Sequence, residues 1–308
     1  MGTMLVVITG GSGLIGGALA RELGSAGHEV TILSRDPGKL KALPAGVRAE
    51  PWDGKTAAGW SALLDRQGGD TAIVHLAGES IASGRWTEER KRRIRDSRVE
   101  SGKAILQAIR AAAVKPRVLL QGSAVGYYGP RGDEVVREDA APGNDFLAEV
   151  CKAWEASTAE AEALGVRRAI LRTGVVLARE GGALPKMALP FKMMAGGPLG
   201  GGRQWFPWIH LADEVGAIRF LVEREDAKGP FNLTAPNPVT NRDLTRLLAR
   251  VLHRPGLLPA PGFALRLALG EMADMLLNGQ RVAPSRLLEL GYTFRFPDAE
   301  PALRSLLD

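Results

Sequence analysis

Residues 4–17 read MLVVITGGSGLIGG, and the expected fold class follows from them. Met4 to Thr9 is apolar and rich in β-branched side chains, which predicts a buried strand. Glycines at positions 10, 13 and 16 follow in the pattern G-x-x-G-x-x-G, and apolar residues then recur at helical spacing as far as Ala26. Alone, the pattern predicts only a tight turn. Between a strand and a helix it is typical of a loop that binds the phosphates of a dinucleotide.

The glycines of this loop have separate expected roles. Gly10 permits the turn, Gly13 lets the backbone approach a pyrophosphate, and Gly16 lets the helix pack closely on the strand. The free N–H groups and the dipole of the helix N-terminus then face the anion. The predicted cofactor contacts in this loop are Gly10, Ser12, Gly13, Leu14, Ile15 and Gly16.

The end of the second predicted strand, Glu29 to Leu33, indicates which dinucleotide is bound. An NAD site usually has a carboxylate here, which holds the ribose 2′-hydroxyl. In this chain Ser34 and Arg35 follow the strand, and the guanidinium of Arg35 can pair with a 2′-phosphate. Asp36 lies beyond the arginine and is expected to face solvent. NADP(H) is therefore the predicted cofactor, with Ser34 and Arg35 among its contacts.

Strands alternate with helices over the first 174 residues. Further strands are expected at 47–50, 72–76, 117–121 and 167–172, and helices at 87–113, capped by Thr87, and at 146–164. This alternation predicts an α/β fold with a doubly wound parallel sheet, the Rossmann architecture, with right-handed crossovers.

After Gly174 the regular alternation of strands and helices ends. Residues 181–202 are rich in Gly, Pro and Met, and two helices are expected at 213–223 and 241–252, with a short strand at 230–233. We expect a Rossmann domain of residues 1–180 and 209–234, and a smaller C-terminal substrate lobe of residues 181–208 and 235–308. The segment from Gly181 to Trp208 is either a lid or a long connector with core aromatics. A lid would have an apolar wall of Met193, Met194, Trp205, Phe206 and Trp208.

Composition excludes several classes of protein. The 308 residues are 45% hydrophobic and 24% charged, which excludes a disordered chain. One cysteine excludes an intramolecular disulfide framework and fits a cytoplasmic setting. No apolar run approaches the ~18 residues of a membrane span, so no membrane partner is expected. Half of the net charge of +6 lies in Glu88 to Arg98, which we interpret as a solvated helix face. Nucleic acid is not expected, because no known binding module is present.

Small residues follow the strand at 72–76, in the sequence His75-Leu76-Ala77-Gly78. Open α/β sheets bind ligands at this edge, so Leu76, Ala77 and Gly78 are predicted to make room for the cofactor. His75 is interpreted as a packed strand residue. Asp53, after the third strand, either meets the adenine or is an ordinary loop residue. No cluster has metal-ligand spacing, and no Gly-x-Ser-x-Gly elbow predicts a hydrolase.

Several segments in this order resemble the extended short-chain dehydrogenase/reductase superfamily: TGGSGLIG, SR, HLAG, SAVGYYG, LRTGVVL and WIHLADEVGAI. More narrowly, they are similar to its atypical, nucleoside-diphosphate-sugar-epimerase-like branch. The segment GRWTEERKRRIRDSRVESG and the final 40 residues resemble that branch's own helix and its C-terminal domain of unknown function. The resemblance implies a Rossmann sheet, NADP(H), a small-molecule substrate and a monomer or homodimer. It adds Arg172, Thr173 and Gly174 as predicted cofactor contacts.

The resemblance fails at the catalytic residues. The superfamily pairs Tyr with Lys in Tyr-x-x-x-Lys, and none of the three tyrosines here is followed by Lys at that spacing. If Glu155 is matched to the family's next Glu, Leu147 stands in the Tyr position and Cys151 in the Lys position. Arg98 replaces the family's Asn. Ser123 matches its Ser, although one residue out of register with Gly129.

Hydride transfer to a carbonyl needs a proton partner within hydrogen-bond reach. The candidates are Ser123, Tyr127, Arg98 and Cys151, with Tyr128 as the alternative to Tyr127. Cys151 is either a tuned thiol or a small buried helix residue. Arg98 either binds substrate or is the last charge of its helix face. The resemblance places His210 on the substrate side, and the alternative is that it caps the helix from Asp213. The predicted function is NADP(H)-dependent hydride transfer on a small polar or sugar-like substrate. The alternative is a non-catalytic NADP(H)-binding or sensing protein.

Overall fold

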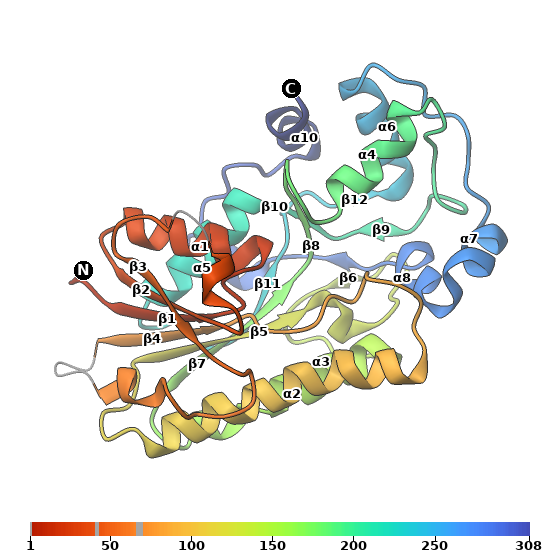
Figure 1. Ribbon diagram of the computed structural model, residues 1–308. Helices are drawn as coiled ribbons and strands as arrows, with labels where there is room; N and C mark the ends of the chain where they lie inside the picture. The colour runs from red at the N-terminus through yellow and green to blue at the C-terminus, as the bar shows by residue number, and fades with distance from the viewer. Residues whose placement is uncertain (1, 41–42, 66–69) are drawn as a thin grey trace.

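The computed structural model describes residues 2–40, 43–65 and 70–308. Seven of the described strands form one parallel sheet in the order β11-β7-β5-β4-β1-β2-β3 (Figure 1). They are β1 (Leu5–Thr9), β2 (Glu29–Ser34), β3 (Val47–Pro51), β4 (Thr71–His75), β5 (Val118–Ala124), β7 (Arg167–Thr173) and β11 (Gly229–Leu233). All neighbouring pairs in this sheet are parallel, as the alternating pattern predicts.

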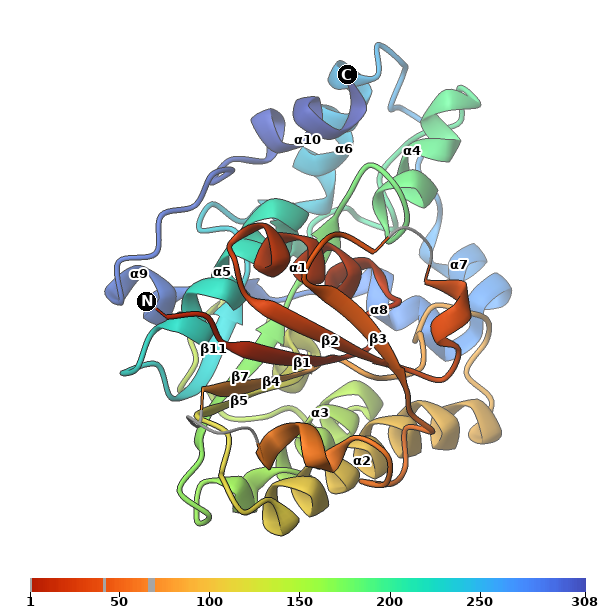
Figure 2. The same cartoon turned by 60° about the vertical axis from the view of Figure 1, so that its left-hand side comes forward.

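Helices cover both faces of this sheet. The first face carries α1 (Leu14–Ser25) and α5 (Leu211–Glu223), and the opposite face carries α2 (Glu88–Ala111) and α3 (Phe146–Ala156) (Figure 2). Alternate residues of β1 point to opposite faces of the sheet. Val6 packs in the hydrophobic core against α1 and α5, and Val7 packs in the core against α2. The doubly wound α/β prediction is therefore confirmed. The strand order reverses between β1 and β4, and doubly wound folds bind their ligands at the carboxyl ends of the strands at such a reversal.

A second, smaller core lies beyond the carboxyl edge of the sheet. It is formed by α4 (Leu184–Lys192), α6 (Asn241–Val251) and α10 (Ala299–Leu307), which lie together in Figure 1. Two short strand pairs join it to the sheet: β8 (Val175–Leu177) with β10 (Trp208–His210), and β9 (Trp205–Phe206) with β12 (Val239–Thr240). The remaining described strands and α-helices are β6 (Val135–Val136), which pairs with β13 (Arg281–Val282), and α7 (Gly262–Leu269), α8 (Asp274–Leu277) and α9 (Ser285–Glu289).

The third helix is shorter than the sequence predicts. It ends at Ala156 rather than at residue 164, and the chain continues through turns and a short 3-10 helix, Ala159–Ala161. Side chains of other elements form hydrogen bonds with polar groups of residues 155–158. Arg168 of β7 donates to the carbonyl oxygen of Glu155, and the Thr158 hydroxyl donates to Gln121 of β5 at 2.8 Å. These contacts are tertiary, so a helical pattern read along the chain cannot reveal them.

The glycine-rich segment contains regular structure that the sequence analysis did not predict. Helix α4 lies within it and buries Leu184 and Phe191 in the second core. Trp208 is 1% exposed in the same core, whereas Met193 and Met194 are exposed on the surface. Trp208 is therefore a core aromatic residue, as one of the two interpretations of this segment predicts. The prediction that all five side chains form one apolar wall is wrong.

The predicted helix caps are present. The Thr87 hydroxyl accepts the N–H of Arg90 at the start of α2, and His210 Nδ1 accepts the N–H of Ala212 at the start of α5. In the part of the chain that the structure describes, no helix is both long and apolar enough to cross a membrane. The described residues also contain no group of His, Cys, Asp and Glu that could hold a metal ion.

Candidate active site

The glycine loop joins β1 to α1 at the carboxyl end of β1, beside the end of β4. Gly10 has a φ of +73°, and a Cβ there would lie 2.8 Å from the carbonyl carbon of Leu76. A Cβ on Gly16 would lie 2.5 Å from the carbonyl oxygen of Gly10. Both positions therefore need glycine, and together they form a compact turn whose N–H groups at the start of α1 suit a pyrophosphate. The individual contacts at Ser12, Gly13, Leu14 and Ile15 stay predictions.

The end of β2 presents a free cation. Arg35 is exposed and pairs with no residue that the structure describes. Asp36 faces solvent, as expected, and its Oδ2 lies 2.8 Å from the ammonium nitrogen of Lys39. The carboxylate next to the arginine is thus neutralised by a lysine, and the guanidinium is available for an external anion.

Asp53 organises the loop after β3. Its Oδ1 accepts the N–H groups of Lys55 and Thr56 at 2.8 and 2.9 Å, and its Oδ2 accepts the Thr56 hydroxyl at 2.9 Å. These hydrogen bonds, led by that of Lys55, lower the pKa of the Asp53 carboxyl. Its role in binding adenine stays a prediction.

His75 is packed inside the sheet, as predicted. Its Nδ1 lies 2.8 Å from the Thr9 hydroxyl, and the indole N–H of Trp154 donates to Nε2 at 3.2 Å. Complete burial lowers its pKa to about 3, so the ring is neutral at physiological pH. His75 therefore braces the ends of β1 and β4 and carries no mobile proton near neutrality.

Arg98 turns from α2 toward the end of β4. A Cβ on Gly78 would lie 2.9 Å from its Cζ, so glycine is what lets the guanidinium approach. Its Nη1 donates to the carbonyl oxygens of Glu79 and Ile94 at 3.0 and 2.9 Å, and its Cζ lies 5.0 Å from the ring centroid of Trp154. Burial lowers its pKa from the usual value. Arg98 is therefore a fixed cation beside the predicted cofactor edge rather than part of the solvated face.

Ser123 belongs to a buried network that the sequence analysis missed. Its hydroxyl donates to Glu155 Oε1 at 2.6 Å. Arg172 holds the same carboxylate in a bidentate pair, with Nε and Nη2 each 3.0 Å from a carboxylate oxygen. Although burial opposes it, this pairing keeps the pKa of Arg172 above its usual value. Because the guanidinium is paired with Glu155, only the backbone of Arg172 remains for the predicted cofactor contact.

The two neighbouring tyrosines have different surroundings. Tyr128 is 0% exposed; its hydroxyl donates to Asn232 at 2.6 Å and accepts from Arg172 at 3.0 Å. Burial raises its pKa to about 12. Tyr127 is only partly buried, and its ring lies under the Arg172 guanidinium, 3.5 Å from Cζ to the centroid. Its hydroxyl has no hydrogen-bond partner among residues 2–40, 43–65 and 70–308. Tyr128 is thus the packed member of the pair.

Cys151 lies on the buried side of α3. Its Sγ lies 3.7 Å from the carbonyl oxygen of Ala124, and burial together with the charge of Glu155 raises its pKa to about 11. It therefore remains a thiol at neutral pH. Leu147, one turn earlier, packs on the chain at Gly126, where a Cβ would lie 3.2 Å from that of Leu147. The two positions that carry Tyr and Lys in the superfamily are apolar or inert here.

Glu214 is a second group that sequence reasoning missed. It is 0% exposed at the start of α5, and its Oε1 lies 2.8 Å from the hydroxyl of Thr173 at the end of β7. The pair Asp213-Glu214 looks like the usual acidic first turn of a surface helix. Only the packing of α5 against β7 and α1 shows that Glu214 faces inward.

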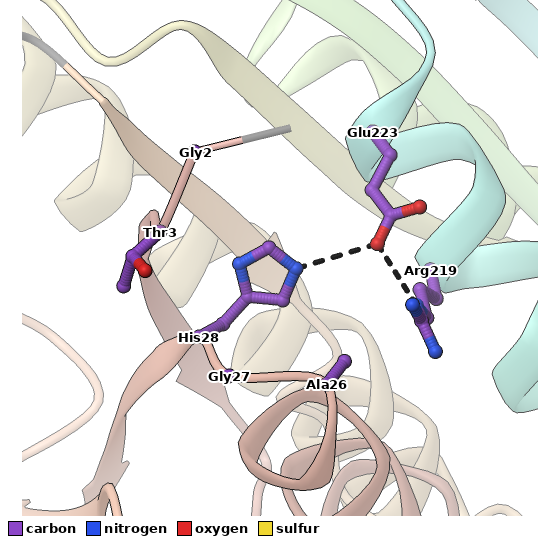
Figure 3. A pocket seen from close by; sticks show the side chains of 7 residues that line it. All are labelled: Gly2, Thr3, Ala26, Gly27, His28, Arg219 and Glu223. Carbon is purple, nitrogen blue, oxygen red and sulfur yellow. Dashed lines mark hydrogen bonds and ion pairs between the residues drawn. The ribbon is translucent and has the colours of Figure 1, made fainter.

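A polar pocket lies at the opposite, amino end of β1 and β2 (Figure 3). His28 Nε2 is 3.3 Å from Glu223 Oε1, which also accepts from Arg219 at 2.8 Å. This pocket ties α5 to β2 and contains none of the predicted cofactor residues.

Comparison with known proteins agrees with this geometry. Residues 6–234 match the model of the NAD-dependent epimerase/dehydratase family, and residues 260–306 match a domain of unknown function. The chain is 40% identical to the chloroplastic epimerase family protein SDR39U1 homolog of Arabidopsis thaliana, over 99% of this chain and 87% of the relative. It is also 40% identical to the epimerase family protein YfhF of Bacillus subtilis, over 99% and 98% of the two chains.

Solved structures show the same likeness. The human epimerase family protein SDR39U1, crystallised with NADPH, superposes with a TM-score of 0.85 and 33% identity over 99% of each chain. A nucleoside-diphosphate sugar epimerase from Corynebacterium glutamicum superposes with a TM-score of 0.77 and 37% identity, over 99% of this chain and 59% of that one. The glycine turn, the parallel sheet with its second core and these matches agree: this chain belongs to the NAD-dependent epimerase/dehydratase family.

Proposed function

We propose that this protein is an NADP(H)-dependent oxidoreductase that transfers hydride between the nicotinamide and a small polar or sugar-like substrate. One observation carries the proposal: the partly exposed Tyr127 hydroxyl and the fixed Arg98 cation lie on the same sheet edge as the glycine turn and Arg35. The NADPH bound to the human relative supports the choice of cofactor.

Each part of this edge has a distinct task. The turn at Gly10 to Gly16 would hold the pyrophosphate, and Arg35 the 2′-phosphate. The cofactor, when bound, supplies or accepts the hydride. Arg98 would orient the substrate by pairing with a carbonyl or an anionic group, because its guanidinium is already fixed by two backbone carbonyls.

Tyr127 is the proposed proton partner. Ser123 already donates its hydroxyl proton to Glu155, and Cys151 is 4% exposed and remains a thiol. Arg98 does not release protons at physiological pH. Tyr127 alone among these candidates combines an unpaired hydroxyl with partial exposure. Its ring is held by Arg172, so the hydroxyl is presented in one orientation.

The second candidate function is a non-catalytic NADP(H)-binding or sensing protein. The observation that favours it is the apolar packing of Leu147 and the inert thiol of Cys151 at the superfamily's catalytic positions. Cofactor turnover separates the two functions.

Tyr127→Phe is expected to reduce turnover by about 10²–10⁴-fold while leaving NADPH affinity unchanged, because it removes a proton donor and keeps the ring. Loss of the reduced nicotinamide signal with a panel of carbonyl substrates measures this. Tight NADPH binding without turnover of any substrate would support the sensing function. Turnover equal to that of the wild type in the variant would remove Tyr127 from the mechanism.

Arg35→Ala is expected to weaken NADPH binding by about 10–100-fold and to leave NADH binding unchanged. A charge-assisted pair contributes about 1.5–3 kcal/mol, and 1.4 kcal/mol is tenfold in affinity. Titration of the intrinsic nicotinamide fluorescence measures both constants. Arg246→Ala, which removes an exposed arginine of α6, is the charge-matched control. An unchanged preference for NADPH over NADH in Arg35→Ala would show that another group binds the 2′-phosphate.

A further inference from the structure

Glu214 is a carboxyl group fully enclosed by protein. Its Oε2 atom is buried and has no hydrogen-bond partner in the described part of the chain. Its other oxygen, Oε1, is 2.8 Å from the Thr173 hydroxyl. A buried carboxylate with a single neutral partner is unfavourable, so a carboxyl group in this position keeps its proton.

Among residues 2–40, 43–65 and 70–308, no cation forms an ion pair with the Glu214 carboxyl. Asp213, on the same helix, accepts the N–H groups of Arg295 and Phe296 at 2.7 and 2.9 Å. Tyr292, from the C-terminal segment, donates its hydroxyl to the Asp213 carbonyl at 3.0 Å, and burial raises its pKa.

On the other described elements packed on α5, no cation contacts the Glu214 carboxyl. On β7, the Arg172 guanidinium is paired with Glu155, and Arg167 donates to carbonyl oxygens at the far end of α5. On α1, Glu22 pairs with Arg219 of α5 at 2.8 Å, and on β10 burial lowers the pKa of His210 to about 4, so that ring is neutral. The side chains of β8, residues 175–177, are uncharged. Burial accordingly raises the pKa of Glu214 to about 8, opposed by the Thr173 hydrogen bond.

The protonation state of Glu214 decides what Thr173 can do. A hydroxyl has one proton to donate and can accept from another donor. In the 2.8 Å contact, the threonine hydroxyl is the donor and Oε1 the acceptor. A neutral Glu214 with its proton on Oε1 can instead donate to Thr173 and leave the threonine proton free for an acceptor at the sheet edge. An ionised Glu214 can only accept, so it would take the threonine proton. Thr173 is partly exposed beside Gly174, at the edge where the cofactor is predicted.

We propose that Glu214, held neutral, is a positioning residue that directs the Thr173 hydroxyl toward an acceptor oxygen of the bound cofactor, and that its ionisation weakens cofactor binding. This rests on the proposed cofactor site and is independent of hydride transfer. Ionisation would also add a negative charge near an anionic ligand, which acts in the same direction.

The test is the dissociation constant of NADPH between about pH 7 and about pH 9.5, a range above the second ionisation of the 2′-phosphate near 6. For the wild type, the constant is expected to rise by about 2–10-fold as the pH passes 8, the effect of losing one hydrogen bond. Glu214→Gln should show no such rise, because its amide donates to Thr173 at every pH. Thr173→Val should bind about 2–10-fold more weakly at pH 7 without the rise, and Thr173→Ser should behave as the wild type.

Two results would overturn the proposal: a wild-type constant that does not change with pH, or the same pH dependence in Glu214→Gln as in the wild type. Thermal unfolding at each pH separates loss of the fold from loss of the ligand. The folded state raises the pKa of Glu214 above its ordinary 4.5, so wild-type stability should fall as pH rises from 4.5 toward 8. Glu214→Gln should lack this fall. A failure of hydride transfer would appear as absent turnover with the binding profile intact.

Discussion

Arg172→Met is expected to lower the free energy of unfolding by about 3–5 kcal/mol, the usual cost of removing one partner of a buried ion pair. Arg172 and Glu155 are 4% and 9% exposed and form a bidentate pair. Without the guanidinium, the Glu155 carboxylate would be buried with only the Ser123 hydroxyl as a side-chain donor. Chemical denaturation followed by tryptophan fluorescence or circular dichroism measures the change.

Two further variants separate the ion pair from side-chain volume. Arg172→Met combined with Glu155→Gln should recover part of the loss, because no charge is then left unpaired. Arg110→Met breaks the exposed pair with Glu160, in which both side chains are about half exposed, and should cost about 0–1 kcal/mol. A cost for Arg172→Met no larger than that for Arg110→Met would contradict the assignment of the Glu155 pair as a structural centre.

Gly16→Val is expected to weaken NADPH binding by more than about 100-fold. The added Cβ would lie 2.5 Å from the Gly10 carbonyl oxygen and 2.8 Å from the Gly11 Cα, and both contacts are with backbone that cannot rotate away. Overpacking costs about 1–3 kcal/mol or more, and here the displacement falls on the turn that would hold the pyrophosphate. Fluorescence titration with NADPH measures the loss, and thermal unfolding shows whether the fold survives.

Gly17 provides the matched control one residue along the same helix. A Cβ there would lie 3.3 Å from the Gly11 carbonyl oxygen, and alanine favours a helix over glycine. Gly17→Ala should bind NADPH within about threefold of the wild type, a difference of less than about 0.7 kcal/mol. Equal losses in Gly16→Val and Gly17→Ala would mean that the helix, rather than the close approach at Gly16, is what the cofactor needs.

The strand and helix pattern was predictable because its signals are local. Buried strands such as β1 and β4 are short apolar runs, and α2 begins at a residue that caps its own helix. The prediction was wrong where tertiary contacts override local preference. At the early end of α3, Arg168 of β7 takes the carbonyl oxygen of Glu155, and just beyond it Thr158 bonds to Gln121 of β5. Helix α4 forms within a segment whose glycines and prolines suggest a loop.

Much less of the candidate site was predictable. The sequence singled out Ser123, Arg98, Cys151 and Tyr127 by position, but their chemical states depend on neighbours far away along the chain. Ser123 meets Glu155, which is 32 residues away. Cys151 is inert because it is buried, and Tyr127 differs from its neighbour in exposure and in the hydrogen bonding of its hydroxyl. The sequence does not indicate that Glu214 is buried, since an acidic residue in a first helical turn usually lies at the surface.

The sequence was enough to predict the parallel sheet, the glycine turn and the arginine after β2, because each depends on a few adjacent residues and on backbone geometry. It also showed that the superfamily's Tyr–Lys pair is absent. Only the tertiary structure decided which polar groups are buried, which are paired and which remain free. Protonation and reactivity follow from desolvation and from partners brought together by folding, and neither is encoded in a local run of residues.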